Sequence, residues 1–409
     1  MQYSLFLFHF YPIFLFLSSM YDKDLLHTLF REKYGEHPVV TYFSPGRVNL
    51  IGEHIDYNGG FVLPAAISLG ITAIVHHRSD QVVRVYAHDM QEEVVFSVGE
   101  YPVFNKKSEP LHWSDYIRAT LQVMQDKNLP LGGADIVMAS DLPLGAGLSS
   151  SAALECLIAF IFGEENYRAD RTQLALDAQT AERKYVGVNC GIMDQFAIAN
   201  GREKEAMLLN CATLDYEYVR ADFGTNNLVI INSNKSRSLA ESKYNERRAE
   251  CDAAFAQMSP FDPAEDLCHV HEISLGYLSD DMLYKRAKHA VLENKRVLLA
   301  AEAMEAGDME TFGQLLTESH ISLDEDYEVS GHELNTIVHY STHFDGCLGA
   351  RMTGAGFGGC CIALVEKEKT PRFMQYVGKK YAEKTGLKAD FFVAEMSDGV
   401  RRLADADSL

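Results

Sequence analysis

A glycine-rich turn runs directly into the start of an apolar helix in the segment Pro143-Leu-Gly-Ala-Gly-Leu-Ser-Ser-Ser-Ala-Ala-Leu-Glu155. The first N–H groups of a helix lack intrahelical partners and carry partial positive charge, and glycines let a backbone close around phosphate oxygens. The segment therefore predicts a phosphate site, to which Ser149, Ser150 and Ser151 add hydroxyl groups. A P-loop would place Lys-Ser or Lys-Thr after its last glycine, but Leu148 and Ser149 follow Gly147. We expect a different nucleotide-binding architecture.

The size and charge of the chain limit its possible functions. Its 409 residues exceed the usual size of a single hydrophobic core, so two domains are expected. With 37 basic and 58 acidic residues, the net charge of -21 argues against general binding to nucleic acid or to an anionic membrane. The 8 scattered cysteines match neither a disulfide framework nor a CxxC metal site, which indicates a reducing, cytoplasmic setting. We expect a monomer by default.

The N-terminal residues differ from the rest of the chain. Leu5 to Leu17 is almost wholly apolar and aromatic, but no basic residue precedes it and no small-residue cleavage site follows it. The run is also too short for a comfortable membrane span. From Met20 onward, the sequence predicts a capped amphipathic helix. We therefore expect residues 1–19 to be a mis-assigned start or an extension whose deletion leaves activity intact.

The hydrophobic pattern predicts an α+β protein with mixed sheets and helices packed on them. A soft boundary near residues 211–226 divides it into domains 20–216 and 217–409. Strands are expected at 71–77, 82–88, 93–98, 134–138, 228–232 and 390–394, and as a strand, glycine turn and strand over 351–365. Helices are expected after Trp113 and at 150–162, 171–185, 243–258, 284–305, 309–318 and 372–384.

A second polar cluster lies in Pro45-Gly-Arg-Val-Asn-Leu-Ile-Gly-Glu-His-Ile-Asp-Tyr-Asn-Gly-Gly60, which contains Arg47, Glu53, His54 and Asp56. An ionised carboxylate accepts hydrogen bonds from two O–H donors in a fixed arrangement, which suits the vicinal hydroxyls of a sugar. Because charged turns are common, spacing alone supports a solvated loop with structural ion pairs about as strongly as it supports a sugar site.

Three segments together resemble a known family. Gly46 to Tyr57 is similar to the galactokinase signature, and the glycine-serine turn resembles the phosphate motif of the GHMP superfamily of small-molecule kinases. Thr353 to Gly359 resembles the third motif of that superfamily. The resemblance covers essentially everything after Met20. It implies a two-domain GHMP kinase fold with the active site in the cleft between the domains. It also implies that the γ-phosphate of ATP passes to the C1 hydroxyl of galactose with the help of Mg²⁺.

The resemblance implies roles for individual residues. Asp194 would be the catalytic carboxylate beside the C1 hydroxyl, as a base for its proton or as a group that orients it, and Arg47 would steady its charge. Galactose would contact Arg47, Glu53, His54, Asp56, Gly191, Asp194 and Tyr244. Ser151 and Glu182 would hold Mg²⁺, a cation that prefers hard oxygen ligands. The nucleotide would be held by Gly145, Ala146, Gly147, Leu148, Ser149, Ser150, Ser151 and Ala152, with Trp113 and Tyr116 beside the adenine.

Structural explanations compete with these roles. Without the resemblance, Glu182 reads as a surface residue in an ion pair, Trp113 as core packing, and Tyr244 as part of a solvated helix face. Gly354 to Gly359 satisfies GxGxxG, but a strand rather than a helix follows it, which argues against a dinucleotide site. His269 and His271 could share one face of a strand as metal ligands, although structural or surface histidines are favoured.

Two other functions stay open. The chain could phosphorylate a related sugar such as N-acetylgalactosamine, or it could be a non-catalytic sensor of galactose and ATP that regulates transcription through a protein partner. Such a sensor could lose residues of the phosphate turn. Because Ser151, Ala152 and Asp194 are all present, the sequence favours the enzyme.

Overall fold

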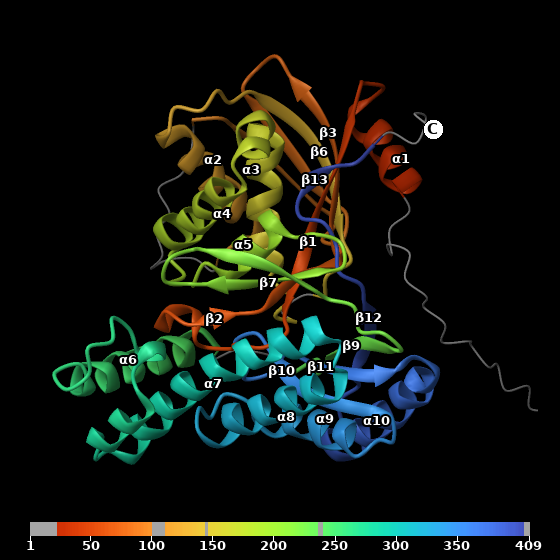
Figure 1. The fold of residues 1–409 in the computed structure, drawn as a ribbon. Helices are drawn as coiled ribbons and strands as arrows, with labels where there is room; N and C mark the ends of the chain where they lie inside the picture. Colours follow the sequence, from red (N-terminus) through yellow and green to blue (C-terminus); the bar gives the residue numbers. More distant parts are fainter. Residues whose placement is uncertain (1–22, 100–110, 144–145, 236–239, 405–409) are drawn as a thin grey trace, which may run out of the picture.

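The structure, a computed structural model, describes residues 23–99, 111–143, 146–235 and 240–404. The predicted extension at residues 1–19 and Gly145 lie outside this part. Helices and mixed sheets confirm the predicted α+β class, with a six-stranded sheet in the upper half of Figure 1, a four-stranded sheet in the lower half, and a three-stranded sheet between them.

The elements of the first half of the chain are α1 (Lys23–Tyr34), β1 (Val40–Asn49), η1 (Asp56–Asn58), β2 (Phe61–Val62), β3 (Pro64–Arg78), β4 (Val82–Ala87), β5 (Glu92–Ser97), α2 (Trp113–Asp126), β6 (Gly133–Ser140), α3 (Ser150–Ala169), α4 (Arg171–Thr180), η2 (Ala181–Val186), α5 (Met193–Asn200), β7 (Glu205–Asn210) and β8 (Tyr216–Arg220). Those of the second half are β9 (Asn226–Asn232), α6 (Ala240–Met258), η3 (Leu267–His269), η4 (Glu272–Tyr277), α7 (Asp281–Ala306), α8 (Met309–Glu325), α9 (His332–Thr342), β10 (Cys347–Thr353), β11 (Cys360–Glu366), η5 (Lys367–Lys369), α10 (Thr370–Thr385), β12 (Asp390–Ala394) and β13 (Arg401–Arg402).

The six-stranded sheet has the order β13-β1-β3-β6-β4-β5 and is antiparallel except where β4 pairs with β6. Side chains alternate between its two faces because the period of a strand is two residues. On β3, Ala73 and Val75 pack into the main core, whereas Ile74 belongs to a separate cluster with Leu26 and Phe30 of α1. The sheet is therefore covered by α1 on one face and by α3 and its neighbouring helices on the other (Figure 1).

The four-stranded sheet has the order β10-β11-β9-β12 and is wholly antiparallel. Residues 228–231 of β9 and 360–365 of β11 are completely buried. Such unbroken apolar runs are typical of strands covered on both faces. Helices α8, α9 and α10 lie beside this sheet, and α7 packs against α8 and contacts β2 and β8 of the three-stranded sheet β2-β7-β8 (Figure 1).

Several local predictions differ from the structure. The sequence analysis did not predict α5, α9, β7, β8 or β13, most of which are shorter than the helices and strands it found. The helix predicted over 171–185 ends at Thr180, and a π-helix, η2, replaces its last part. The strand considered at His269 and His271 is wrong, since this segment forms a 3-10 turn in which the two histidines pair with Asp266 and Asp262.

Strands on either side of the predicted domain boundary pair with each other. The boundary between residues 216 and 217 falls at the start of β8, which pairs with β7. Near the C-terminus, β13 pairs with β1 of the first sheet. The chain therefore returns to the sheet in which it began, and a division into domains 20–216 and 217–409 stays a prediction.

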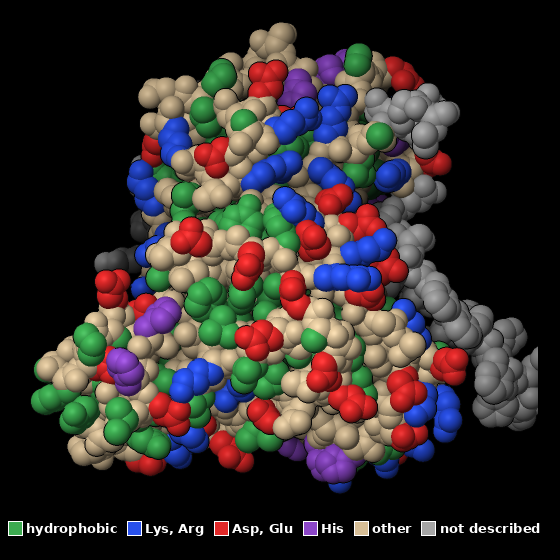
Figure 2. All heavy atoms as spheres, viewed as in Figure 1, with side chains coloured by type: hydrophobic (Ala, Val, Ile, Leu, Met, Phe, Trp, Pro, Cys, Tyr) green, Lys and Arg blue, Asp and Glu red, His purple; other side chains and the backbone are tan. Residues whose placement is uncertain are grey.

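Charged side chains of both signs are spread over the face of the molecule seen in Figure 2. On the face shown in Figure 2, Lys and Arg side chains lie among Asp and Glu side chains rather than in one continuous basic patch. Within the described ranges, no helix is both long and apolar enough to cross a membrane.

Candidate active site

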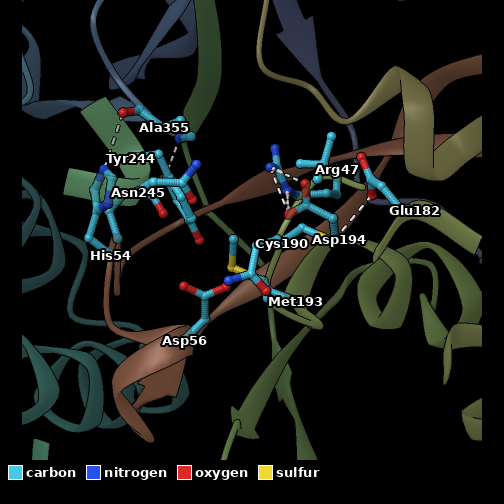
Figure 3. A pocket seen from close by; sticks show the side chains of 15 residues that line it. Arg47, His54, Asp56, Glu182, Cys190, Met193, Asp194, Tyr244, Asn245 and Ala355 are labelled. Carbon is cyan, nitrogen blue, oxygen red and sulfur yellow. Dashed lines mark hydrogen bonds and ion pairs between the residues drawn. The ribbon is translucent and has the colours of Figure 1, made fainter. Parts of the chain in front are cut away.

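A cavity of about 220 Å³ lies where four segments meet. These are the end of β1 with the loop after it, the connection from η2 to α5, the beginning of α6, and the turn between β10 and β11 (Figure 3). Every residue predicted to bind the sugar lines it, namely Arg47, Glu53, His54, Asp56, Gly191, Asp194 and Tyr244, and so does Glu182. Folding therefore brings together residues that are separated by up to about 200 positions in the sequence.

Arg47 and Asp194 form the central ion pair of the cavity. Nε and Nη2 of Arg47 donate to Oδ1 and Oδ2 of Asp194 at 2.8 Å each, and Nη1 donates to the carbonyl oxygen of Gly147 at 2.6 Å. The bidentate geometry holds the carboxylate in a single orientation. The Arg47 side chain is only 5% exposed, whereas that of Asp194 is 31% exposed. The carboxylate is thus held from behind and open toward the cavity.

The glycine-serine turn lies directly beside this ion pair. Gly147 has φ of +80° and Ser149 has φ of +61°, so the chain makes two left-handed steps before α3 begins at Ser150. The Ser149 hydroxyl donates to Asp194. The side chains of Ala146, Leu148 and Ala152 are buried in the core. The Ala146 N–H donates to the carbonyl oxygen of Pro143, and the carbonyl oxygen of Leu148 accepts from the Arg47 N–H. Binding of an anion at the start of α3 stays a prediction.

Glu182 lies within the same site, whereas the sequence without the resemblance favours a surface position for it. The π-helix η2 carries it inward, where it is 6% exposed and accepts a hydrogen bond from Ser151 Oγ at 3.3 Å. Local π-helical geometry often occurs at functional sites. Burial and the nearby Asp194 raise the pKa of Glu182 to about 7.

Three residues around Glu182 were missed by the sequence analysis. Gln195 Nε2 donates to Glu182 Oε2 at 2.6 Å and to Glu155 Oε2 at 3.2 Å, while Cys190 Sγ lies 3.4 Å from Glu182 Oε2. Burial raises the pKa of Glu155 well above its ordinary value, and the charge of Glu182 adds to the effect. For Cys190 and Gln195, the signal in the sequence is the segment 187–196, which is polar where a core would be apolar.

Asp56 and Gly191 form one wall of the cavity. A Cβ atom on Gly191 would lie 1.7 Å from Asp56 Oδ2, so only glycine allows the two segments to approach this closely. Burial, together with the charges of Asp194 and Glu53, raises the pKa of Asp56 to about 7. A carboxyl with this pKa can lose its proton near neutral pH, and the carboxylate can then accept hydrogen bonds from a ligand.

Glu53 connects the first and third motifs. Its carboxylate accepts hydrogen bonds from Thr353 Oγ1 at 3.1 Å, from the backbone N–H of Gly354, and from the Asn49 side chain. Gly354 in turn packs against Gly147, since a Cβ atom added to Gly354 would lie 3.1 Å from the Gly147 carbonyl oxygen. The turn between β10 and β11 therefore joins Glu53 to the glycine-serine turn at Gly147.

His54 and Tyr244 pack together on the far side of the cavity. His54 has φ of +62°, and its ring nitrogens lie 2.9 Å from Tyr57 Oη and 3.2 Å from the carbonyl oxygen of Ala355. The ring of Tyr244 lies 5.5 Å from that of His54. Burial lowers the pKa of His54 to about 3, so the imidazole is neutral. Tyr244 belongs to the cavity wall and not to a solvated helix face.

The structure does not place Trp113 and Tyr116 on the cavity wall. Trp113 is half-buried at the start of α2, where its Nε1 donates to Glu92 Oε2 at 2.8 Å. Tyr116 packs against a small cluster that contains Ala181 and Val186 of η2. Contact of these two side chains with adenine stays a prediction.

Comparison with known proteins gives the same assignment for all three motifs. The galactokinase galactose-binding signature matches residues 28–77, and the N-terminal and C-terminal domains of GHMP kinases match residues 115–202 and 300–383. Galactokinase from Ligilactobacillus salivarius is 43% identical over 388 residues, which cover 93% of this chain and 100% of the relative. Galactokinase from Streptococcus suis is 44% identical over 390 residues, which cover 94% and 99%.

Solved structures extend the likeness to the fold. The crystal structure of Lactococcus lactis galactokinase complexed with galactose has a TM-score of 0.87 and 39% identity, and the match covers 93% of this chain and 100% of that one. Mevalonate kinase from Methanococcus jannaschii has a TM-score of 0.64 at 19% identity and so shares the fold alone. With its GHMP kinase fold and these relatives, the chain belongs to the galactokinase family.

Proposed function

We propose that the protein transfers the γ-phosphoryl group of MgATP to the C1 hydroxyl of α-D-galactose, giving galactose 1-phosphate and ADP. The observation that carries this proposal is the position of Asp194. Its carboxylate, held by Arg47, opens into a cavity with the sugar-signature residues on one side and the start of α3 on the other.

Asp194 is proposed to receive the hydrogen bond of the C1 hydroxyl and to accept its proton as the phosphoryl group is transferred. Phosphoryl transfer depends mainly on alignment of the hydroxyl with the phosphate and on stabilisation of spread negative charge. The ion pair with Arg47 fixes the direction of the carboxylate, and the hydrogen bond from Ser149 joins it to the phosphate turn. The hydroxyl and the phosphate would therefore be aligned by one connected group of side chains.

The phosphates are proposed to bind the start of α3 and the turn before it, through the backbone of residues 145–152 and the hydroxyls of Ser149, Ser150 and Ser151. The N-terminus of a helix stabilises a nearby negative charge by about 0.3–1 kcal/mol in an exposed position. The positive φ angles at Gly147 and Ser149 turn the chain sharply into the helix. Trp113 and Tyr116 remain our candidates for adenine contact.

Ser151 and Glu182 fit a magnesium ion. Their oxygens are hard donors 3.3 Å apart beside the phosphate turn. The described residues contain no cluster of three or more His, Cys, Asp or Glu side chains that could hold a metal alone. This donor set suits a cation that keeps its waters and shares phosphate oxygens. Bound there, Mg²⁺ would neutralise phosphate charge, and Gln195 would keep the Glu182 carboxylate turned toward it.

Galactose is proposed to bind Glu53, His54, Asp56, Gly191 and Tyr244 on the opposite side of the cavity. Asp56 and Glu53 supply acceptors for sugar hydroxyls, and the close approach of Gly191 to Asp56 sets the width of the site. The aromatic rings of His54 and Tyr244, which are inclined by 41° to each other, add a wall of ring surface.

A panel of sugars tests the activity. Release of ADP is measured with galactose, N-acetylgalactosamine, glucose and arabinose in parallel, with and without Mg²⁺. We expect Mg²⁺-dependent release with galactose and little with glucose. A preference for N-acetylgalactosamine would indicate a related sugar kinase, and binding of galactose and ATP without ADP release would indicate a sensor.

We also propose that the protein works as a monomer in the cytoplasm. All 8 cysteines are free, and 5 of them are buried, which suits a reducing compartment. Light scattering at working concentration tests the oligomeric state, and a mass twice that of the chain would contradict it.

A further inference from the structure

We propose that His289 and Glu293 of α7 are positioning residues. They would hold the loop between β1 and β2, residues 50–60, in the conformation that binds the sugar. The proposal rests on the sugar-binding role assigned above to Glu53. Neither side chain is among those that line the cavity in the described part of the chain, and both lie outside the three segments matched by family signatures, 28–77, 115–202 and 300–383.

The two residues belong to a stripe along one face of α7. His289, Glu293 and Val297 are spaced four residues apart and therefore lie above one another on the helix. All three are completely buried. An ionisable pair at such positions costs free energy unless each polar atom finds a partner. The hydrogen-bond partners of His289 and Glu293 show which part of the chain these two residues support.

Glu293 holds the loop at Gly52. Its Oε1 accepts hydrogen bonds from the Gly52 backbone N–H at 3.0 Å and from Ser319 Oγ at 2.6 Å, and its Oε2 accepts one from Arg296 Nε at 2.7 Å. Although burial acts to raise the pKa of Glu293, the charge of Arg296 and the hydrogen bonds bring it to about 2. The carboxylate is therefore a charged acceptor for the loop N–H, and such bonds are stronger than neutral ones.

His289 holds the loop one residue further on. Its Nε2 donates to the carbonyl oxygen of Glu53 at 3.0 Å, and its Nδ1 accepts from Ser322 Oγ at 2.9 Å. Burial lowers the pKa of His289 to about 4, which agrees with a neutral ring that donates on one side and accepts on the other. The backbone N–H of Gly52 and the carbonyl of Glu53 are thus both held by α7, so the direction of the Glu53 side chain is set from outside the cavity.

The loop also packs tightly against α7 at Val297, one helical turn beyond Glu293. Gly52 has φ of +102°, and a Cβ atom there would lie 2.9 Å from Val297 Cγ2 and 2.9 Å from the Phe61 carbonyl oxygen. Beyond the loop, the Phe61 N–H donates to Asn294 Oδ1 of α7 at 2.8 Å. A helix from the second half of the chain therefore binds three backbone groups of this segment, the Gly52 N–H, the Glu53 carbonyl and the Phe61 N–H. Figure 1 shows α7 running beneath β2, which directly follows this loop.

The test compares sugar binding with nucleotide binding in three variants. Glu293→Gln keeps the size of the side chain but removes the charge, His289→Leu removes both hydrogen bonds, and His289→Gln restores a donor and an acceptor. We expect Glu293→Gln and His289→Leu to raise the Kd and KM for galactose about tenfold, in line with the loss of one buried hydrogen bond, with the KM for ATP changed less than about twofold. His289→Gln should recover part of the loss.

Asp262→Asn is the matched control, because Asp262 is a buried carboxylate that accepts hydrogen bonds from the His271 N–H, the Ser274 hydroxyl and the Ala264 N–H, away from the cavity. It should lower the melting temperature without changing the KM for galactose. If Glu293→Gln folds too poorly, Ser319→Ala weakens the same anchor and should raise the Kd for galactose by about two- to fivefold.

Calorimetry with galactose alone separates this inference from the proposed function. Normal galactose binding in Glu293→Gln and His289→Leu, or equal rises in the KM for galactose and for ATP, would overturn the positioning role while leaving the kinase assignment in place. Absence of galactose binding by the unmodified protein would instead overturn the proposed function.

Discussion

Replacement of Asp56 by asparagine tests whether the ionised Asp56 carboxylate lowers the stability of the folded protein. The folded carboxyl keeps its proton up to about pH 7, because of burial and the nearby charges of Asp194 and Glu53, whereas the ordinary value is 3.8. Between these two pH values the folded protein binds more protons than the unfolded chain does. The contribution of Asp56 to stability therefore falls as the pH rises from about 4 to about 7.

The magnitude follows from the same two pKa values. Each pKa unit corresponds to about 1.4 kcal/mol, so the ionised Asp56 of the folded protein at pH 8 carries a penalty of at most about 4 kcal/mol. Because Asp56 is only partly buried, we expect about 2 kcal/mol to be recovered by asparagine, which has no charge to bury. This corresponds to a rise in melting temperature of about 2–4 °C for a chain of this length.

Thermal unfolding is measured without ligands at pH 5 and pH 8 for the unmodified protein, Asp56→Asn and the control Asp252→Asn, which removes the same charge from an exposed position on α6. The gain in melting temperature for Asp56→Asn should be larger at pH 8 than at pH 5, and galactose affinity should fall. A gain that does not grow with pH, or that Asp252→Asn reproduces, would refute the reasoning.

Three further variants test the remaining parts of the site. Asp194→Asn should lower kcat by about a thousandfold or more while calorimetry still detects galactose binding, and near-normal kcat would remove Asp194 from the mechanism. Glu182→Gln should raise the Mg²⁺ concentration that gives half-maximal activity by roughly tenfold or more, with unchanged galactose affinity, and an unaltered Mg²⁺ titration would contradict its role. Gly191→Ala should abolish galactose binding because its Cβ would lie 1.7 Å from Asp56, whereas Gly276→Ala, where no atom lies within 4 Å, should bind normally.

Local sequence rules predicted the elements that carry long, regular patterns. The strand at 133–140, the turn after it and the helix from Ser150 follow from alternation, glycine and helix-start signals within about 25 residues. Short elements such as α5 and β7 were missed, because their few residues do not show a full hydrophobic period. The π-helix at η2 was also missed, although it decides that Glu182 points inward.

The sugar and phosphate residues could be named from three motifs, but their contacts could not. Arg47 and Asp194 are 147 positions apart, and only the folded chain shows the bidentate pair between them. The same holds for Glu53 with Gly354, 301 positions apart. Neither propensity nor spacing describes such pairs, because they depend on how sheets and helices from both halves are stacked.

Motifs made of neighbouring residues thus carry the chemistry of this protein, since backbone conformation, helix starts and the order of polar side chains are local properties. The tertiary structure decides which groups support that chemistry from a distance. His289 and Glu293 look like ordinary helix residues in the sequence, and their hydrogen bonds to Glu53 and Gly52 exist only because α7 packs against a loop more than 230 positions earlier. Packing of elements far apart in the chain depends on the whole core, so no single segment of sequence contains it.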